Sequence, residues 1–404
     1  MKTLSILLVA FALTSTHRAE AADPPRRRVV VVEPVVLCDD DGTHPARWKL
    51  AKKLVDRVYT RSDLEFVYTE PRFWGYSKGR LGQVNLDTIV KEATRQRVIR
   101  GGKRVVTMFF VDAIDGRAKL MGRGKQNGNI TFVCLGKDEV KEPVLNFVIA
   151  HEVGHNFNLR HAVDDPKVPD DVPNLQGDGP FEKRLAVDGL TEYQRDEVLK
   201  SPLVRERIEF ADTNEALEIL REELARGSLE GSSANYLRFT LGVKKLSDDQ
   251  ASANREAESL LKECVRPFTQ AEQATMRKAI AEIAADHDKS WPLLTRFPWS
   301  FVKVKGGFCS SFSHTRGLHI FFAEPVVTRL MSNPQKLREL LLHEKLHVLQ
   351  RLYPRRFEKL AEYYGFHSVL GASLPTELVA YEVPNPDASG TYWALRHAGK
   401  LSFL

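Results

Sequence analysis

The chain has 404 residues, more than one typical domain, so two domains are expected. Hydrophobic residues make up 43% and charged residues 28% of it, which are ordinary values for a globular protein. The net charge of +6 is spread along the chain, without a basic tract that carries interleaved aromatic residues. This distribution argues against a nucleic-acid partner.

The first 21 residues, MKTLSILLVAFALTSTHRAEA, have the pattern of a signal peptide. Lys2 supplies the positive start, Leu4 to Leu13 form a short apolar run, and Ala19-Glu20-Ala21 matches an A-x-A cleavage site. The run is too short to span a bilayer, and no later segment reaches that length. We therefore expect a secreted or periplasmic protein, cleaved near Ala21, without stable membrane insertion.

Strands and helices alternate through the first part of the chain. Strands are predicted at 27–38, 64–73 and 103–114, helices at 45–61 and 85–99, and one or two more strands within 118–136. A helix at 143–157 follows, with Pro143 at its start. This alternation predicts an α/β sheet of about five strands.

The second part of the chain begins with helices, from 185 to about 290, and ARGSLEGSS (225–233) has a linker composition. Two strand-bearing stretches, 299–312 and 317–325, then precede a helix over 334–354. The order of strands followed by a helix that carries H-E-x-x-H therefore occurs twice, although no residue-level repeat is visible.

Four cysteines, Cys38, Cys134, Cys264 and Cys309, divide evenly between the two halves. Export would permit disulfides, and the pairing Cys38–Cys134 with Cys264–Cys309 respects a two-domain division. Buried free thiols are the alternative.

The stretch HEVGHNFNLRH contains the first chemical motif. His151 and His155 are four residues apart, so on a helix they lie on one face, with Glu152 beside them. His161 would point away if the helix continued, so the chain must break and fold back for this side chain to join them. Asn158 is the best non-glycine residue for that break, because asparagine tolerates a positive φ at the end of a helix.

This stretch resembles the zinc-binding motif of the metzincin peptidases, H-E-x-x-H-x-x-G-x-x-H. The resemblance implies that His151, His155 and His161 bind zinc and that Glu152 is the general base. Asn158 replaces the usual glycine. Three histidines leave an open position on the zinc for water. A structural zinc usually has four protein ligands, often cysteines, and no cysteine lies near this motif. A zinc-activated water with a glutamate base is peptide-hydrolysis chemistry.

The resemblance extends over roughly residues 28–204, but only the eleven-residue motif is specific. The family places a methionine in a turn beneath the zinc, and Gln176 of NLQGDGP occupies the expected position here. This departure bears on the positioning of the metal more than on its binding, because that methionine is not a ligand.

The helix LLLHEKLHVLQR carries a second motif, formed by His343, Glu344 and His347. Tyr353, six residues after the second histidine, provides no third histidine. A gluzincin-like arrangement would take Glu377 as the third ligand, and three other acidic residues are alternatives, namely Glu362, Glu382 and Asp387. A helix whose histidines only pack in a core is the competing interpretation.

Two smaller patterns can each be interpreted either as part of a functional site or as an ordinary structural feature. CDDDGTH (38–44) suggests either a calcium site or a turn that ends a strand, and the turn is favoured. His314 and His319 precede the second motif, and they either line its cleft or are ordinary surface or packing histidines, which is favoured.

These patterns predict a signal peptide at 1–21, a metzincin-like domain at 22–204, a helical connector at 205–260 and a second H-E-x-x-H domain at 261–404. Each domain is expected to be a zincin-like α+β or α/β fold, with a small mixed sheet packed on helices.

The predicted function is an exported zinc metalloendopeptidase acting on peptides or proteins, with catalytic Glu152 and, in the second domain, Glu344. One Zn²⁺ is expected in the first domain, and a second ion is possible in the other. The alternative is a secreted binding or scaffold protein with structural zinc.

Overall fold

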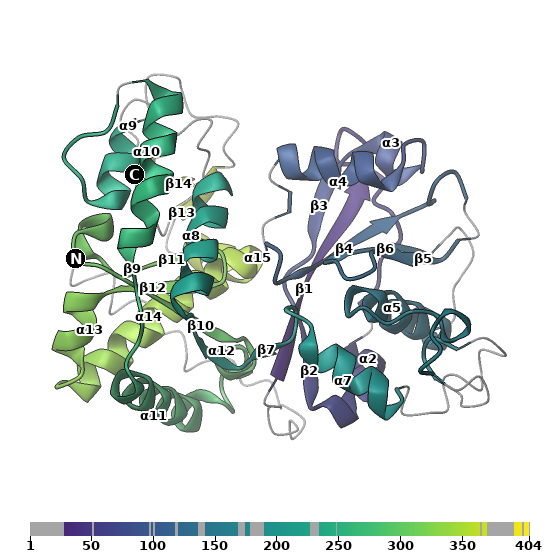
Figure 1. The fold of residues 1–404 in the computed structure, drawn as a ribbon. Helices are drawn as coiled ribbons and strands as arrows, with labels where there is room; N and C mark the ends of the chain where they lie inside the picture. Colours follow the sequence, from purple (N-terminus) through teal and green to yellow (C-terminus); the bar gives the residue numbers. More distant parts are fainter. Residues whose placement is uncertain are drawn as a thin grey trace. The chain divides into compact units, whose positions relative to one another are not determined.

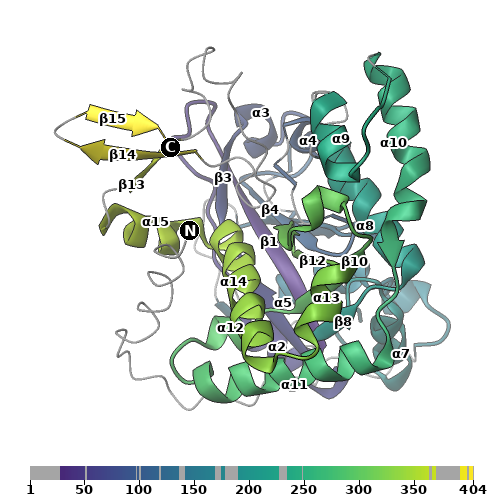
Figure 2. The same cartoon turned by 90° about the vertical axis from the view of Figure 1, so that its left-hand side faces the viewer.

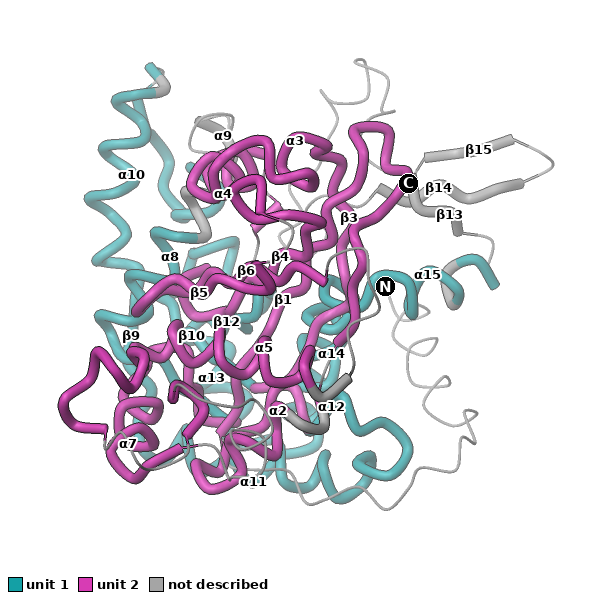
Figure 3. Tube along the Cα trace, turned by 90° about the vertical axis from the view of Figure 1, so that its right-hand side faces the viewer, with its two compact units in different colours: residues 1–22, 208–295, 299–404 teal, residues 23–207, 296–298 magenta. Residues whose placement is uncertain are grey.

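The computed structural model describes residues 28–50, 52–96, 98–99, 102–117, 120–135, 142–168, 174–177, 190–226, 234–247, 249–363, 366–369, 392–397 and 400–403 (Figure 1). The chain is a mixture of helices and mixed β-sheets. It divides into two compact units (Figure 3). Unit 2 contains the described residues up to Arg207 together with Arg296–Pro298, and unit 1 contains Ile208–Thr295 and the described residues from Trp299 onward.

Unit 2 is built around one mixed sheet with helices packed against it. The strands, in chain order, are β1 (Arg28–Cys38), β2 (Leu64–Tyr68), β3 (Arg72–Gly75), β4 (Val106–Val111), β5 (Gly122–Gly124), β6 (Ile130–Cys134) and β7 (Arg205–Glu206). The helices are α2 (Lys52–Val58), η2 (Thr60–Ser62), α3 (Ser77–Arg80), α4 (Leu86–Arg95), α5 (Glu142–Asn156), η3 (Ala162–Asp164) and α7 (Glu192–Lys200).

The strand order in this sheet is β2-β1-β4-β6-β5, and β3 and β7 also pair with β1. The β2, β3, β4 and β6 pairings are parallel, whereas β5 runs antiparallel to β6 and β7 antiparallel to β1. The strand predicted at 64–73 is therefore two strands, β2 and β3, separated at Pro71, which has no N–H to donate to a ladder.

Alternate residues of β1 enter two apolar cores, because successive side chains of a strand point to opposite faces. Val30 and Val32 pack with Ile149 of α5 on one face. On the other face, Val35 packs with Ile89 of α4. Helices thus cover both faces of the sheet, which explains why a strand with so many β-branched residues is buried along nearly its whole length.

Two local predictions in unit 2 are confirmed. The Asn85 side chain caps α4 by accepting a hydrogen bond of 2.8 Å from the Thr88 N–H. The helix predicted at 143–157 corresponds to α5. The helix predicted at 45–61 is shorter, since among the described residues of that range only Lys52–Val58 is α-helical.

Unit 1 contains a second mixed sheet and a separate small antiparallel sheet. Its strands are β8 (Ile208–Phe210), β9 (Val265–Arg266), β10 (Trp299–Val304), β11 (His314–Arg316), β12 (His319–Ala323), β13 (Phe366–Val369), β14 (Tyr392–His397) and β15 (Lys400–Phe403). The helices in this part of the chain are α8 (Thr213–Arg226), α9 (Ala234–Leu241), α10 (Gln250–Cys264), α11 (Gln270–His287), α12 (Pro292–Arg296), η4 (Phe308–Ser311), α13 (Glu324–Leu330), α14 (Pro334–Leu352) and α15 (Pro354–Tyr363).

The main sheet of unit 1 has the order β11-β12-β10-β8, with β9 added to β10, and β13-β14-β15 form the small sheet. Both α13 and α14 contact β12 (Figure 2). The segment interpreted as a connector, 205–260, packs within this unit from β8 onward, because apolar residues such as Leu220 and Leu241 join the same core as Val302 and Phe321. Most of the linker candidate at 225–233 lies outside the described residues.

Of the two alternatives for the cysteines, the structure confirms buried free thiols, since all four are free and buried. Cys38 ends β1 and Cys134 ends β6, and β4 lies between these strands. Two strand spacings of about 4.8 Å separate their backbones by more than the roughly 7 Å that a disulfide can span. Cys264 and Cys309 share one apolar core, where they pack as small hydrophobic residues.

The N-terminal segment with the signal-peptide pattern lies outside the described residues. Among the helices that the structure does describe, none has both the length and the apolar character needed to cross a bilayer.

Candidate metal centre

The helix α5 places His151 and His155 on one side, one turn apart. Their ring centroids are 4.9 Å apart and the rings are nearly perpendicular, at 84°. The helix itself is held by apolar side chains, including Leu145, Ile149 and Val153, which are buried in the core against the sheet. The sequence expectation that these two histidines share a face is thus confirmed.

The end of α5 forms a Schellman motif around Asn158. This residue has a φ of +69°, as predicted. Its N–H donates to the carbonyl of His155 at 3.0 Å, and the N–H of Leu159 donates to the carbonyl of Gly154, also at 3.0 Å. These two bonds satisfy carbonyls that the last helical turn leaves open, and they turn the chain back towards α5.

The reversal brings His161 to the two helical histidines. Its Nε2 atom lies 3.2 Å from Nε2 of His151, and its ring centroid lies 4.8 Å from that of His155. The candidate ligand atoms of the three histidines all lie within 4.8 Å of one another. This cluster can hold a metal ion.

Backbone carbonyls orient the two helical histidines. Nδ1 of His151 lies 3.0 Å from the carbonyl oxygen of Leu175, and Nδ1 of His155 lies 2.8 Å from that of Leu159. A carbonyl only accepts hydrogen bonds, so each Nδ1 carries a proton, and in the neutral ring each Nε2 keeps its lone pair. Metal-binding histidines are commonly held in this way. Around His161, Oδ2 of Asp164 lies 4.0 Å from Nδ1.

The spacing of the cluster fits zinc. Zn–N bonds of about 2.0–2.1 Å in a tetrahedron place two ligand nitrogens about 3.4 Å apart. The separation of 3.2 Å between Nε2 of His151 and of His161 is close to that value. His161 is the exposed member of the cluster, so its ring has the most freedom to adjust to an ion.

Gln176 lies directly beneath the helix that carries these ligands. Its Nε2 donates to the carbonyl of His151 at 2.8 Å, and a Cβ on Gly154 would come within 2.2 Å of the same nitrogen. The carbonyl of Gln176 accepts from the N–H of Ala162, next to His161, at 2.9 Å. The buried turn around Gln176 therefore joins the two segments that carry the histidines.

Glu152 is buried beside β5 rather than open to bulk water. Its Oε2 accepts a hydrogen bond of 2.5 Å from the N–H of Gly124. Burial raises the pKa of Glu152 to about 7, and the Gly124 hydrogen bond and the positive charge of Arg123 oppose this shift only in part. Burial likewise lowers the pKa of His155, which favours the neutral, metal-binding form of its ring.

Sequence reasoning overlooked the two glycines of β5. A Cβ on Gly124 would lie 2.0 Å from the carbonyl oxygen of Glu152, and one on Gly122 would lie 2.5 Å from the Glu152 side chain. Only residues without a side chain allow β5 to approach α5 this closely. The G-R-G pattern within a predicted strand was the available signal.

Among the described residues, the second motif brings only its two histidines together. Nε2 of His343 and Nε2 of His347 lie 3.1 Å apart on α14, and Glu344 is buried between them along the helix. Of the four acidic candidates for a third ligand, Glu362 is exposed on α15. The other three, Glu377, Glu382 and Asp387, lie outside the described residues.

The upstream histidines of unit 1 pack in its core. His314 is fully buried and stacks on Phe321 at a centroid distance of 5.0 Å. His319 is buried too, with Nδ1 2.8 Å from the Ser300 hydroxyl. These contacts agree with the packing interpretation of both residues.

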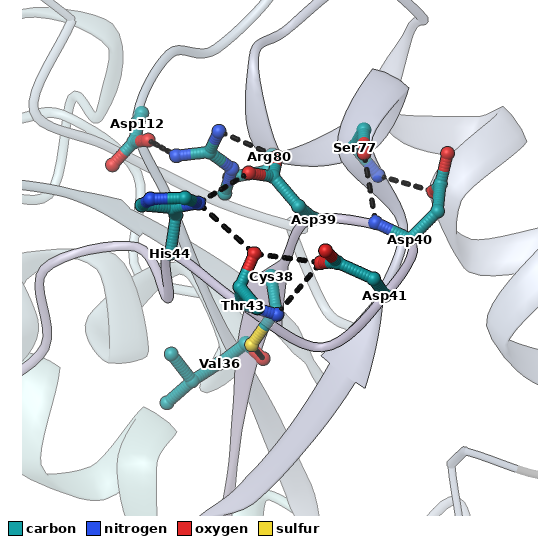
Figure 4. A network of polar contacts seen from close by, with 10 residues as sticks. All are labelled: Val36, Cys38, Asp39, Asp40, Asp41, Thr43, His44, Ser77, Arg80 and Asp112. Carbon is teal, nitrogen blue, oxygen red and sulfur yellow. Dashed lines mark hydrogen bonds and ion pairs between the residues drawn. The ribbon is translucent and has the colours of Figure 1, made fainter.

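The acidic turn after β1 is a network of internal contacts (Figure 4). Arg80 donates to Asp39 at 2.7 Å and to Asp112 at 2.6 Å. Asp40 and Asp41 accept hydrogen bonds from the backbone N–H groups of Ser77 and Thr43. Because its carboxylates already have these partners, the segment is a turn that ends a strand, as favoured from the sequence.

Neither a scan against protein-family models nor a search of curated proteins finds a match to this chain.

Proposed function

We propose that unit 2 is a zinc-dependent peptidase of the metzincin type and that the protein acts on peptides outside the cytoplasm. His151, His155 and His161 would hold the ion, and Glu152 would be the general base. The observation that carries this proposal is the convergence of three imidazole nitrogens from one helix and the segment that folds back on it. The signal-peptide pattern of the first 21 residues supports a secreted or periplasmic location.

The ligand set favours zinc with an open position. Three imidazoles suit zinc among the common biological cations, and a site with three protein ligands keeps a position for water or substrate. A bound zinc ion supplies Lewis acidity and brings the pKa of a coordinated water close to neutrality.

Glu152 would take the proton from the attacking water and pass it to the amine that leaves. Its Oε2 is fixed by the Gly124 N–H, so the carboxylate is held against β5, on the same helix as His151 and His155. A rigid, buried carboxylate meets the geometric requirement for a general base better than a mobile surface one.

A peptide substrate would add to the strand next to this carboxylate. Among the described residues, β5 pairs only with β6, and it is the last strand in the order of the sheet. An extended peptide can add to such a strand through main-chain hydrogen bonds. Gly122 and Gly124 keep this part of β5 close to Glu152.

The test separates hydrolysis from metal binding. We expect Glu152→Gln to keep its zinc, measured by elemental analysis, and to lose cleavage of a broad peptide library. Glu197→Gln, which changes a carboxylate on α7 of the same unit, is the matched control and should cleave as the wild type does. Cleavage by Glu152→Gln at the wild-type rate would refute this mechanism. If the zinc-loaded wild type cleaves nothing, the alternative of a binding or scaffold protein with structural zinc is the better description.

A further inference from the structure

Unit 1 repeats the strand arrangement that surrounds the histidine cluster of unit 2. In unit 2, β1 pairs with β4 and β4 with β6 in parallel, and β6 pairs with β5 in antiparallel. In unit 1, β8 pairs with β10 and β10 with β12 in parallel, and β12 pairs with β11 in antiparallel. The corresponding strands also follow one another in the same order along the chain.

A helix with H-E-x-x-H occupies the same place in both arrangements. The helix α5 follows β6 and contacts both β6 and β5. Similarly, α14 follows β12, after the short α13, and contacts both β12 and β11. The two units thus share a strand and helix topology as well as a five-residue motif. This shared topology argues against a chance occurrence of the second motif.

The two helical histidine pairs have nearly the same geometry. The rings of His343 and His347 have centroids 4.6 Å apart and an interplanar angle of 87°, compared with 4.9 Å and 84° for His151 and His155. Their Nε2 atoms are 3.1 Å apart, near the roughly 3.4 Å expected for two nitrogens on a tetrahedral zinc ion.

Contacts around α14 hold this pair in position. Nδ1 of His347 lies 3.1 Å from Oε1 of Gln350, an oxygen that can only accept, so the proton is on Nδ1 and Nε2 keeps its lone pair. One turn further along, Arg351 donates to the Thr315 and Gly317 carbonyls, which fastens the helix to β11.

We propose that His343 and His347 form a second metal site, which binds a divalent transition-metal ion of the zinc class in unit 1. Within the part of the chain that the structure describes, no third ligand atom converges on these two histidines. Tyr353 occupies the position equivalent to His161, and Pro354 begins a new helix there instead of a return segment. The proposal concerns metal binding and does not depend on the peptidase activity of unit 2.

The proposed site is tested in the full chain, in a variant that lacks the three-histidine cluster of unit 2. The background variant carries His155→Gln and His161→Ala, is freed of metal by chelation, and is then titrated with Zn²⁺ by calorimetry. We expect about one equivalent to bind. Adding His343→Gln and His347→Gln should abolish this binding, whereas His287→Gln, on α11 of the same unit, should leave it unchanged. Circular dichroism and thermal unfolding establish that each variant is folded.

A second measurement needs no substitution in α14. In the background variant labelled at histidine nitrogens, Zn²⁺ should shift the Nε2 resonances of His343 and His347 and leave that of His287 in place. The proposal is overturned if the background variant binds no Zn²⁺, if the added glutamines leave binding unchanged, or if the two resonances do not move.

Discussion

Nε2 of His151 and Nε2 of His161 lie 3.2 Å apart, although the two histidines are ten positions apart along the chain. No straight helix allows this approach, because a residue ten positions further on would lie about 15 Å along the axis. The Schellman motif at Asn158 removes that distance by reversing the chain. The metal centre therefore depends on one turn as much as on its three ligands.

His161→Ala should lose most of its zinc affinity, because two imidazoles remain where three converge. We expect the zinc affinity to fall by more than roughly 100-fold. That value is the upper end of the losses caused by removing a residue that only hydrogen-bonds to a metal ligand. Competition with a chromophoric chelator measures the change. His44→Ala, which removes an exposed histidine of the same unit, is the control. Equal zinc retention by His161→Ala and wild type would show that this residue is not a ligand.

Asn158→Gly should be tolerated, because glycine adopts a positive φ without steric cost. Asn158→Val should destabilise the site by about 1–3 kcal/mol, since a β-branched residue at a φ of +69° is strained. Thermal unfolding of the zinc-loaded protein and its zinc affinity check both changes. A valine variant with unaltered zinc affinity would mean that the reversal does not rely on this conformation.

Gly124→Ala should separate β5 from α5. The new Cβ would lie 2.0 Å from the backbone oxygen of Glu152, and neither backbone can give way cheaply. We expect reduced peptide cleavage, because the strand and the carboxylate are pushed apart, and weaker zinc binding, because the new Cβ would also lie 3.0 Å from the Cβ of His155. Gly128→Ala is the comparison, since there the three nearest atoms to the new Cβ belong to the side chain of Lys125 and not to a backbone. Wild-type cleavage by Gly124→Ala would contradict a role for this close contact.

Gln176→Ala should weaken zinc binding by roughly 10–100-fold without removing a ligand. The substitution deletes the hydrogen bond to the His151 carbonyl and leaves a gap beneath Gly154. Zinc titration reports the loss, and Gln83→Ala, at an exposed position in the same unit, should have no effect. If Gln176→Ala binds zinc as tightly as wild type, the turn positions the ligands through its backbone alone.

The local features of this site were accessible from the sequence. The shared face of His151 and His155 follows from helix geometry within four residues, and the reversal at Asn158 follows from the few residue types that accept a positive φ. The buried strands and the helix cap at Asn85 were predictable for the same reason. Each depends on neighbours in the chain.

Tertiary structure decided which distant segments meet. The position of Gln176 beneath α5, the burial of Glu152 against Gly124 and the contact of His151 with the Leu175 carbonyl all depend on packing between elements that spacing along the chain does not specify. The same holds for Cys38 and Cys134, which a simple division of the chain pairs but an intervening strand keeps apart. Local propensities are set by a few consecutive residues, whereas the order of strands in a sheet is set by the burial of all of them together.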